Sequence, residues 1–278
     1  MRPTLIRANV PWWRIDFREI WEYRDLIGIM AQRDLTSAYK QSVLGPTWFV
    51  IQPLLTTLVF TVVFGHIAKI GTDGVPPILF YMGGMLAWNF FANCMNSIAG
   101  TLTGNVALFG KVYFPRLCVP VVKVLANAAT LGLNFAMFLG FWLYYRFRAG
   151  VALPPAWHML GFLPVLVVAA ILGVAMGLLL ASTTIRYRDV KFFLPFLSQL
   201  WMYASPVIYP SSSVGEQWRW IVAVNPMAWV VEATRRCLTG HGTFAAAQAA
   251  AGAAAALVLL AIGLLAFNRA QRTFVDVA

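Results

Sequence analysis

Charged side chains are scarce in this sequence. They make up 11% of the 278 residues, whereas hydrophobic side chains make up 60%. A soluble domain carries roughly 25% charged residues, so this chain has too little polar surface to face water on every side. Inside a bilayer only helices and closed barrels satisfy the backbone amides, and the long unbroken apolar runs favour helices. The composition predicts an all-α integral membrane protein.

Cysteine, histidine and acidic residues are also few. The three cysteines and three histidines lack the spacing of metal ligands, so neither a metal site nor a disulfide framework is expected. None of the ten acidic residues lies at the middle of a predicted span. A transporter coupled to protons or sodium usually keeps such a charge, despite a cost of roughly 2.5–3.5 kcal/mol. Ion coupling is therefore disfavoured.

The sequence contains no phosphate-binding loop of the form GxxxxGK[ST], so this chain is not expected to bind ATP by itself. Its net charge of +11 does not indicate a nucleic-acid partner, because Lys and Arg lie in short segments between apolar runs. Fourteen of them lie on the N-terminal side of the predicted spans and six on the opposite side. The positive-inside rule then places both termini in the cytoplasm.

Apolar runs of about 20 residues predict six transmembrane helices. They lie near residues 46–67, 77–99, 119–145, 157–182, 192–209 and 245–267. Segment 216–238 is too polar for a lipid-facing span, and two short half-buried helices at the outer interface are expected there instead. The predicted organisation is a cytoplasmic N-terminal segment (1–45), a transmembrane domain (46–270) and a cytoplasmic tail (271–278).

An amphipathic helix is expected before the first span. Apolar residues recur there every three or four positions, at Phe17, Ile20, Tyr23, Ile27 and Met30, which is the spacing of one helical face. Such a helix beside a span is expected to lie in the cytoplasmic interface. The alternative is a small soluble helix packed on loops. The Gly45-Pro46 pair should separate this segment from the first span.

Uncharged polar residues recur in register within two spans. Asn89, Asn93 and Asn96 share one face of the second span, and Asn127 and Asn134 share one face of the third. They either form hydrogen bonds between helices or line a path for a hydrophilic substrate. By contrast, the GxxxG pattern from position 173 to 177 is typical of close helix packing.

The fifth predicted span is rich in aromatic residues, among them Phe196, Trp201 and Tyr203. Flat rings with hydrogen-bonding tips suit the apolar faces of sugars. An aromatic belt at the membrane interface explains rings at the ends of the run, but explains Trp201 and Tyr203 poorly. Both interpretations remain open.

Three segments carry a resemblance to a known family. They are RDLTSAYKQSVLGPTWFVIQP at 33–53, IRYRDVKFFLPFLSQLWMYASPVIYP at 185–210 and VNPM at 224–227. Together they resemble the permease subunits of ABC-2 type exporters, in the Wzm-like branch that exports O-antigen and related polysaccharides or polyol phosphates. The resemblance implies a bacterial inner-membrane homodimer with an N-terminal interface helix and a re-entrant helical hairpin at 216–238. It also implies two separate ATPase subunits that bind ATP and magnesium, so no cofactor is expected in this chain.

The same resemblance suggests roles for three groups of residues. The loop after the second span would dock on the ATPase through Phe109, Lys111, Tyr113, Phe114 and Arg116; a basic loop held by anionic lipid headgroups is the alternative. Phe196, Trp201, Tyr203, Asn89 and Asn93 would line the substrate channel. Arg186 and Arg188 would contact the pyrophosphate of a lipid-linked glycan.

The expected function is therefore export of a polysaccharide linked to undecaprenyl pyrophosphate, with no bond chemistry in this chain. Within transport, the alternatives are a permease for a teichoic-type polymer, a drug or a small lipid. A membrane glycosyltransferase or phosphotransferase acting on the same lipid carrier should show clustered acidic or metal-binding residues, and the sequence has no such cluster. A secondary flippase usually needs about twice as many spans and an ionisable residue within them.

Overall fold

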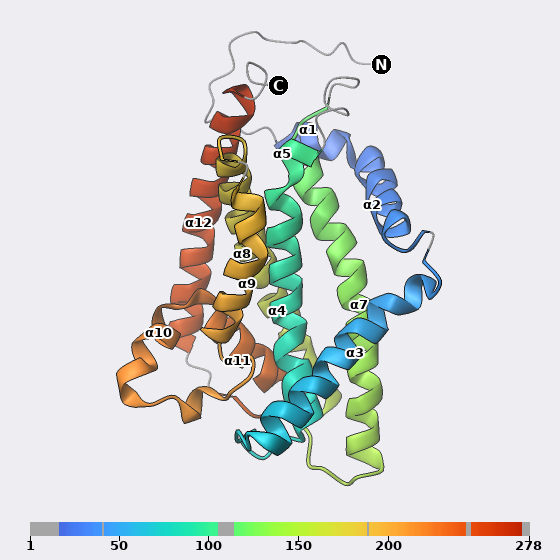
Figure 1. Cartoon of the computed structure of the whole chain (residues 1–278), viewed down its shortest axis with the longest axis vertical. Helices are drawn as coiled ribbons and strands as arrows, with labels where there is room; N and C mark the ends of the chain where they lie inside the picture. The colour runs from blue at the N-terminus through green and yellow to red at the C-terminus, as the bar shows by residue number, and fades with distance from the viewer. Residues whose placement is uncertain (1–16, 41, 105–113, 188, 243–245, 274–278) are drawn as a thin grey trace.

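The computed structural model describes residues 17–40, 42–104, 114–187, 189–242 and 246–273, and every regular element among them is helical. Five helical segments are long and apolar enough to cross a membrane, which makes this a multi-pass membrane protein (Figure 1). They confirm five of the six predicted spans. Their bounds are Gly45–Ile67, Pro77–Ala99, Cys118–Phe147, Ala156–Thr184 and Ala247–Gln271.

The first span begins at the predicted break. Gly45 has φ +55°, a left-handed conformation that glycine adopts without steric cost, and it opens the short 3-10 turn η1 (Gly45–Thr47). Helix α3 (Trp48–Phe60) follows and widens into a π-helical stretch, η2 (Thr61–Ile67). The left-handed residue thus turns the chain from the N-terminal segment into the membrane.

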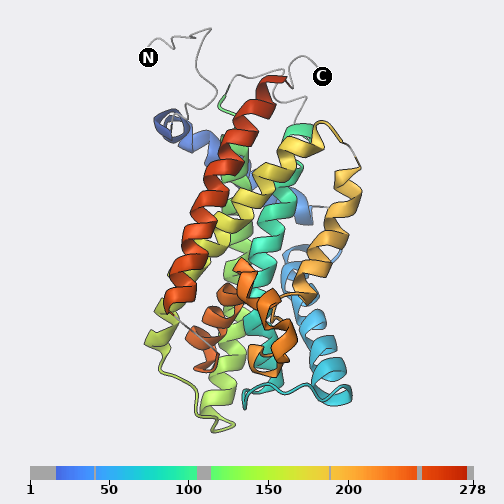
Figure 2. The ribbon, with the colours of Figure 1, turned by 90° about the vertical axis from the view of Figure 1, so that its left-hand side faces the viewer.

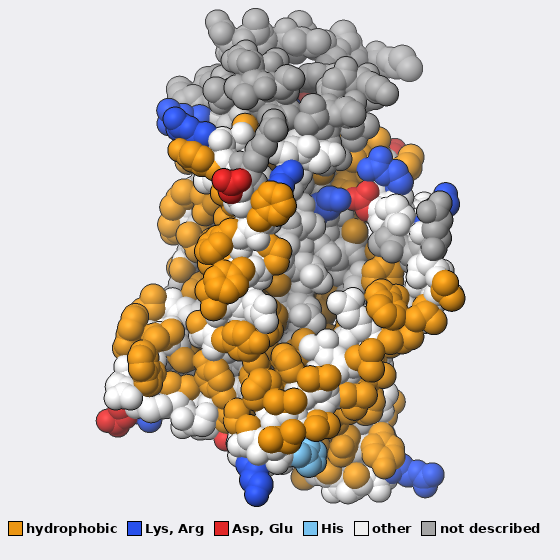
Figure 3. Space-filling view, in the orientation of Figure 1, with side chains coloured by type: hydrophobic (Ala, Val, Ile, Leu, Met, Phe, Trp, Pro, Cys, Tyr) orange, Lys and Arg blue, Asp and Glu red, His pale blue; other side chains and the backbone are white. Residues whose placement is uncertain are grey.

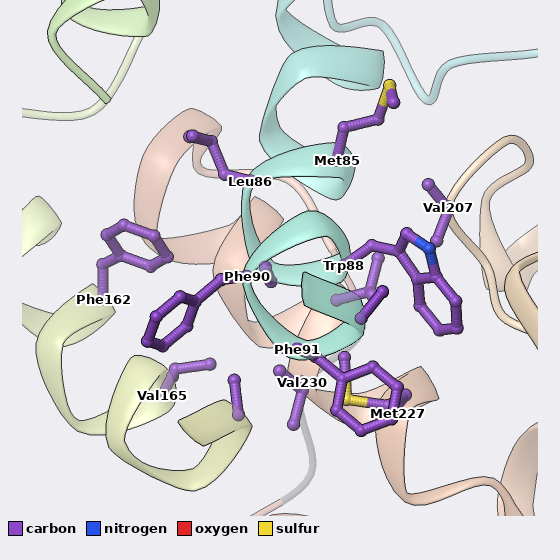
Figure 4. Close-up of a cluster of buried hydrophobic side chains, with 14 of the residues drawn as sticks. Met85, Leu86, Trp88, Phe90, Phe91, Phe162, Val165, Val207, Met227 and Val230 are labelled. Atoms are coloured by element: carbon purple, nitrogen blue, oxygen red, sulfur yellow. The ribbon is translucent and has the colours of Figure 1, made fainter. Parts of the chain in front are cut away.

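Helix α4 (Pro77–Ala99) lies at the centre of the bundle (Figures 1 and 2). Of the most apolar part of this span, 89% of the residues are buried inside the chain, against 6% for the first span. Figure 4 shows why: aromatic side chains of α4 pack against residues of α8 (Phe162–Thr184) and α11 (Pro226–Thr239). The predicted GxxxG contact is also confirmed, because Gly173 and Gly177 of α8 lie directly against α4.

The fifth predicted span is shorter than expected. Helix α9 (Val190–Tyr203) has 14 residues and is therefore about 21 Å long, less than the roughly 30 Å of a hydrocarbon core. Pro206 ends it, because the residue before a proline disfavours the helical conformation. The segment from Ser205 to Ile208 continues as a buried loop. At the other end of the chain, α12 (Ala246–Thr273) runs beyond the predicted boundary at 267.

The chain between α9 and α12 forms the two expected short helices, α10 (Arg219–Val224) and α11. They lie at the end of the molecule opposite α1 (Phe17–Glu22) and the last turns of α12 (Figure 1). Four shorter helical turns complete the described elements. Turn α5 (Thr101–Gly104) follows α4, η3 (Ala156–Gly161) precedes α8, and η4 (Ser211–Ser213) and η5 (Glu216–Trp218) precede α10.

The N-terminal amphipathic segment packs on a span rather than on loops. It forms α1 and α2 (Arg24–Tyr39), with a break at Tyr23. Ile27 and Met30 of α2 are buried against Val119 and Val122 of α7 (Cys118–Phe147). The predicted apolar face therefore holds α2 on the N-terminal end of α7.

An ion pair strengthens this contact. Lys123, the charge that the sequence places within a span, lies 2.6 Å from Asp34 of α2, which also accepts a hydrogen bond from Arg33. Burial by itself would raise the pKa of Asp34. The hydrogen bonds and positive charges of Lys123 and Arg33 outweigh this effect, so the pKa lies below the ordinary value of 3.8. Because the pKa of Asp34 is lower in the folded protein than its ordinary value, ionisation of Asp34 stabilises the contact fully above the ordinary value, and this stabilisation is lost as the pH falls through the folded-state pKa.

We expect single charge reversal at this pair to loosen α2. Asp34→Lys or Lys123→Asp should increase chymotryptic cleavage of α2 in membrane vesicles several-fold, because two like charges then face each other in a half-buried contact. The double exchange should restore protection. Reversal of the exposed Arg18–Glu22 pair, whose atoms are 3.8 Å apart, serves as the control. Equal cleavage of all variants would show that the ion pair does not hold α2.

Candidate functional site

One face of the bundle is hollowed along α4. Figure 3 shows this hollow between two ridges of hydrophobic side chains, which Figure 1 identifies as α9 on one side and α2 and α3 on the other. Both α3 and α9 project from the bundle on this side (Figure 2). Among the described residues of α3 only Thr57 is buried, and in α9 only Leu194 and Ser198 are. Most of the surface of these two helices is therefore not covered by the rest of the chain.

The polar residues of the two middle spans meet beside this hollow. Asn89 and Asn93 of α4 line a narrow groove together with Asn127 and Asn134 of α7. The groove has about 30 Å³ of free space, which is enough for a water molecule but not for a sugar ring. A substrate that passed along this groove would contact its asparagine side chains without entering it.

The asparagines divide between the two sequence-based interpretations. Asn127 donates to the Ser97 hydroxyl at 3.1 Å and so links α7 to α4, while Asn96 accepts from Ser198 of α9 at 3.1 Å. These two form the interhelical bonds of the simpler interpretation. The side chains of Asn89 and Asn93 make no hydrogen bond within the described part of the chain. They therefore remain candidates for substrate contact.

The aromatic residues of α9 also separate into two groups. The ring of Trp201 packs edge-on against Phe91 and Trp88 of α4, with centroids 5.0 and 6.4 Å away. Its indole nitrogen donates to Asn225 at 2.9 Å. Phe196 and Tyr203 are instead 55% and 47% exposed. Trp201 thus joins α9 to the core, whereas Phe196 and Tyr203 are available to a partner or a substrate.

Asn225, in the VNPM segment, connects α9 to the hairpin. Its side-chain oxygen caps the start of α11 by accepting from the Met227 amide at 3.0 Å, and its side-chain nitrogen donates to Ala204 and Ser205. An N-terminal cap of this kind is typically worth about 1 kcal/mol. The motif is therefore a joint between the end of α9 and the hairpin.

A buried ion pair lies in α11, the second helix of the hairpin that α10 and α11 form. Glu232 and Arg235 of α11 are 3% and 1% exposed, and their charged atoms are 2.6 Å apart. The guanidinium also donates to the Pro206 carbonyl at 2.7 Å and lies 3.8 Å over the ring of Phe80. One side chain thus holds α11, the loop after α9 and α4 together.

The predicted ATPase-docking residues are only partly described. Phe109, Lys111 and Tyr113 lie outside the described residues. Phe114 is 5% exposed and packs in the contact between α2 and α7, while Arg116 donates to the Gln271 carbonyl of α12. Within this chain, Phe114 and Arg116 support the interface helix and the last span. Their role in docking remains a prediction.

The two arginines predicted to meet a pyrophosphate lie between α8 and α9. Arg186 is exposed, with its guanidinium 5.9 Å from the centre of the Tyr187 ring. Arg188 lies outside the described residues. This turn is at the same end of the molecule as α1 and α5 (Figure 1), as expected for a contact on the side of the termini.

Sequence reasoning missed two ion pairs, and each had a detectable signal. Glu232 and Arg235 are opposite charges three residues apart in one helix, a spacing that brings side chains together. Lys123 is a single charge within a span, which indicates a partner. The position of the partner, Asp34, could not be read from spacing because it is 89 residues away.

Comparison with known proteins agrees with this architecture. The "O-antigen export system permease protein RfbA" of Myxococcus xanthus is 27% identical over 93% of this chain and 97% of its own length. A protein of the same description from Klebsiella pneumoniae is 24% identical over 91% of this chain and 95% of its own. The "Polysialic acid transport protein KpsM" of Escherichia coli is 21% identical over 74% and 78%, respectively.

The family match covers α2, the first four of the five long spans, and α10 and α11. Residues 25–238 match the family described as ABC-2 type transporter. That range begins in α2 and ends in α11, so it includes the hollow face, the Asn225 joint and the buried ion pair. The chain therefore belongs to the ABC-2 type transporter family, as a membrane permease.

Proposed function

We propose that this chain is the permease subunit of an exporter that moves a lipid-linked polysaccharide across the cytoplasmic membrane. The substrate is of the O-antigen kind, built on undecaprenyl pyrophosphate, and a separate ATPase subunit supplies the energy. Two relatives named as O-antigen export permeases match more than 90% of the chain, which supports this choice of substrate.

The observation that carries the proposal is the hollow face between α3 and α9. Helix α3 with its continuation η2, and helix α9, expose apolar residues, among them Leu58, Val62, Phe196 and Tyr203. A second copy of the chain would cover these helices and turn two hollow faces into one path. A polymer needs such a continuous path rather than a single closed pocket.

The position of α9 supports six crossings. Five long spans alone would leave α1 and the last turns of α12 on opposite sides, yet both lie at one end of the molecule (Figure 1). Helix α9 and its buried loop lead from that end towards the hairpin and so supply the sixth crossing. With the bias of Lys and Arg, this end is cytoplasmic and the hairpin is at the outer interface.

The proposed path uses two kinds of side chain: exposed aromatic rings, and amides that make no hydrogen bond within the described part of the chain. Phe196 and Tyr203 offer ring faces to sugars, and Asn89 and Asn93 offer amides with free hydrogen-bonding capacity. Arg186 is at the cytoplasmic end, where it would meet the pyrophosphate of the carrier together with Arg188, which follows it by two positions in the sequence.

Force from the ATPase would enter at the cytoplasmic end. Two ATPase copies would bind near α5 and the predicted docking residues between 105 and 116. Their movement would reach α7 through the contact that Phe114 and the Asp34–Lys123 pair make with α2. The chain itself then needs no nucleotide site.

Deletion of the gene tests the proposal. We expect a lipid-linked polysaccharide to accumulate on the cytoplasmic side and the surface polymer to disappear, with both effects reversed by the intact gene. Extraction of the lipid fraction followed by sugar analysis measures the accumulation. Accumulation of a phosphate-rich polymer would favour a teichoic-type substrate instead. If no lipid-linked glycan accumulates, a drug or small-lipid permease becomes the better explanation.

A further inference from the structure

A second cavity lies at the outer end of the bundle, away from the hollow face. It is enclosed by η4, α10 and α11 on one side and by the first turns of α12 on the other, and it has a volume of about 740 Å³. This is within the range of roughly 300–1,000 Å³ that is usual for ligand sites. The helices α10 and α11 that line it lie at the end of the molecule opposite α1 (Figures 1 and 2).

Several hydrogen-bonding groups line the cavity. Glu232 contributes a carboxylate, Gln248 an amide and Arg219 a guanidinium, and Asn225 and Ser211 also border it. The hydroxyl of Ser211 is buried and has no hydrogen-bond partner in the described part of the chain. A buried hydroxyl left in this state costs about 1–3 kcal/mol, and a ligand hydroxyl would remove that cost once the atoms that cover Ser211 move aside.

The side chains of Glu232 and Asn225 are held in fixed positions by hydrogen bonds within the chain. Glu232 is fixed by Arg235 and accepts from the Ser211 amide at 3.3 Å, and Asn225 is fixed by Trp201 and the start of α11. The indole ring of Trp229 contacts Gly252 of α12 so closely that a Cβ atom at position 252 would lie 1.7 Å from the indole nitrogen. The wall is therefore preorganised, which lowers the entropic cost of binding.

Much of the remaining wall is apolar, including Ala228, Ala251 and Ala255. An acyl chain would gain from these surfaces but would take water away from the Gln248 amide and the Arg219 guanidinium, which is costly. A pyranose ring matches both parts, because it has hydroxyls at its edges and apolar C–H faces. The mixture of groups favours a sugar over a lipid.

We propose that this cavity binds a short, uncharged and hydroxyl-rich stretch of oligosaccharide on the outer side of the membrane. This inference rests on the proposed function and deepens it. Each permease copy then has, besides its part of the transport path, a site that holds the emerging polymer and opposes its backward movement.

The test uses the oligosaccharide released by mild acid from the lipid-linked polymer of the deletion strain. Calorimetry measures its binding to the purified full-length protein in nanodiscs. We expect Ala255→Phe, which fills the cavity, and Gln248→Leu, which removes an exposed amide, each to weaken binding at least tenfold. Ala254→Phe is the matched control, because Ala254 neighbours Ala255 on α12 but does not line the cavity, and its binding should be unchanged.

Other results would overturn the inference. Equal affinity of all variants, or no binding by the unsubstituted protein, would reject the cavity as a sugar site while leaving export intact. Loss of a co-purified phospholipid in Ala255→Phe, without sugar binding, would identify a lipid site instead. If the deletion strain accumulates no glycan, the proposed function itself fails. The exposed position of Gln248 keeps the test valid even if Ala255→Phe does not fold.

Discussion

Arg235→Ala will lower the thermal unfolding midpoint of the purified protein by roughly 10 °C. Removing one partner of a buried ion pair typically costs about 3–5 kcal/mol, because the other charge remains buried without compensation. Here the loss is broader than one pair. The guanidinium also holds the Pro206 carbonyl and covers Phe80, so the hairpin, the loop after α9 and α4 lose their shared contact.

Arg236→Ala is the matched control, because Arg236 is the exposed neighbour on the same helix. Arg235→Lys should behave almost like Arg235→Ala, since an ammonium group cannot bond Glu232 and the Pro206 carbonyl in the fixed geometry of a guanidinium. Unfolding is followed by tryptophan fluorescence in detergent. Midpoints of Arg235→Ala and Arg236→Ala that agree within about 2 °C would contradict the structural role given to the pair.

Leucine at positions 173 and 177 together will prevent correct folding. A Cβ atom at Gly177 would lie 2.7 Å from the Cβ of Ile98 and 3.1 Å from the Met95 carbonyl, and one at Gly173 would lie 2.8 Å from the Cβ of Cys94. Two of these contacts involve side-chain atoms next to the α4 backbone, which cannot move without shifting the helix. Gly177→Ala alone should destabilise by about 1–3 kcal/mol through overpacking.

Gly140→Leu is the control for this prediction. Gly140 lies on α7, also in a span, and an added Cβ atom there meets nothing within 4 Å. The fraction of monodisperse protein in size-exclusion chromatography should fall at least tenfold for the double variant and stay unchanged for the control. Normal elution of the double variant would mean that α8 and α4 are not in the close contact described.

Much of the fold was predictable because lipid imposes strong local rules. The spans at 46–67 and 77–99 were predicted within one residue at each end, since an apolar run of the required length has no alternative to a helix in a bilayer. The break at Gly45 and the two helices of the hairpin were predicted for similar reasons. In each case the signal lies within about 20 consecutive residues.

The candidate site was predictable only in part. Periodicity placed Asn89, Asn93 and Asn96 on one face of α4, but not the division by which Asn96 bonds α9 while the other two border the groove with α7. The aromatic content of the fifth predicted span suggested Trp201 as a substrate-channel residue. The structure packs its ring against Phe91 and bonds it to Asn225, and its contact with substrate stays a prediction. Spacing identifies a helical face, but the neighbour of that face depends on how distant segments pack.

The sequence by itself determined that this is a helical membrane protein, where most of its spans lie and which family motifs it carries, because hydrophobic burial in lipid acts on each segment separately. Only the tertiary structure decided that α9 ends at Tyr203, that Lys123 pairs with Asp34 and that Arg235 joins three elements at the base of the hairpin. It also decided that the outer cavity forms between α11 and α12. Most of these features join residues that are close in space but far apart along the chain. The interaction energies depend on distances in the folded structure, which a local sequence pattern does not specify.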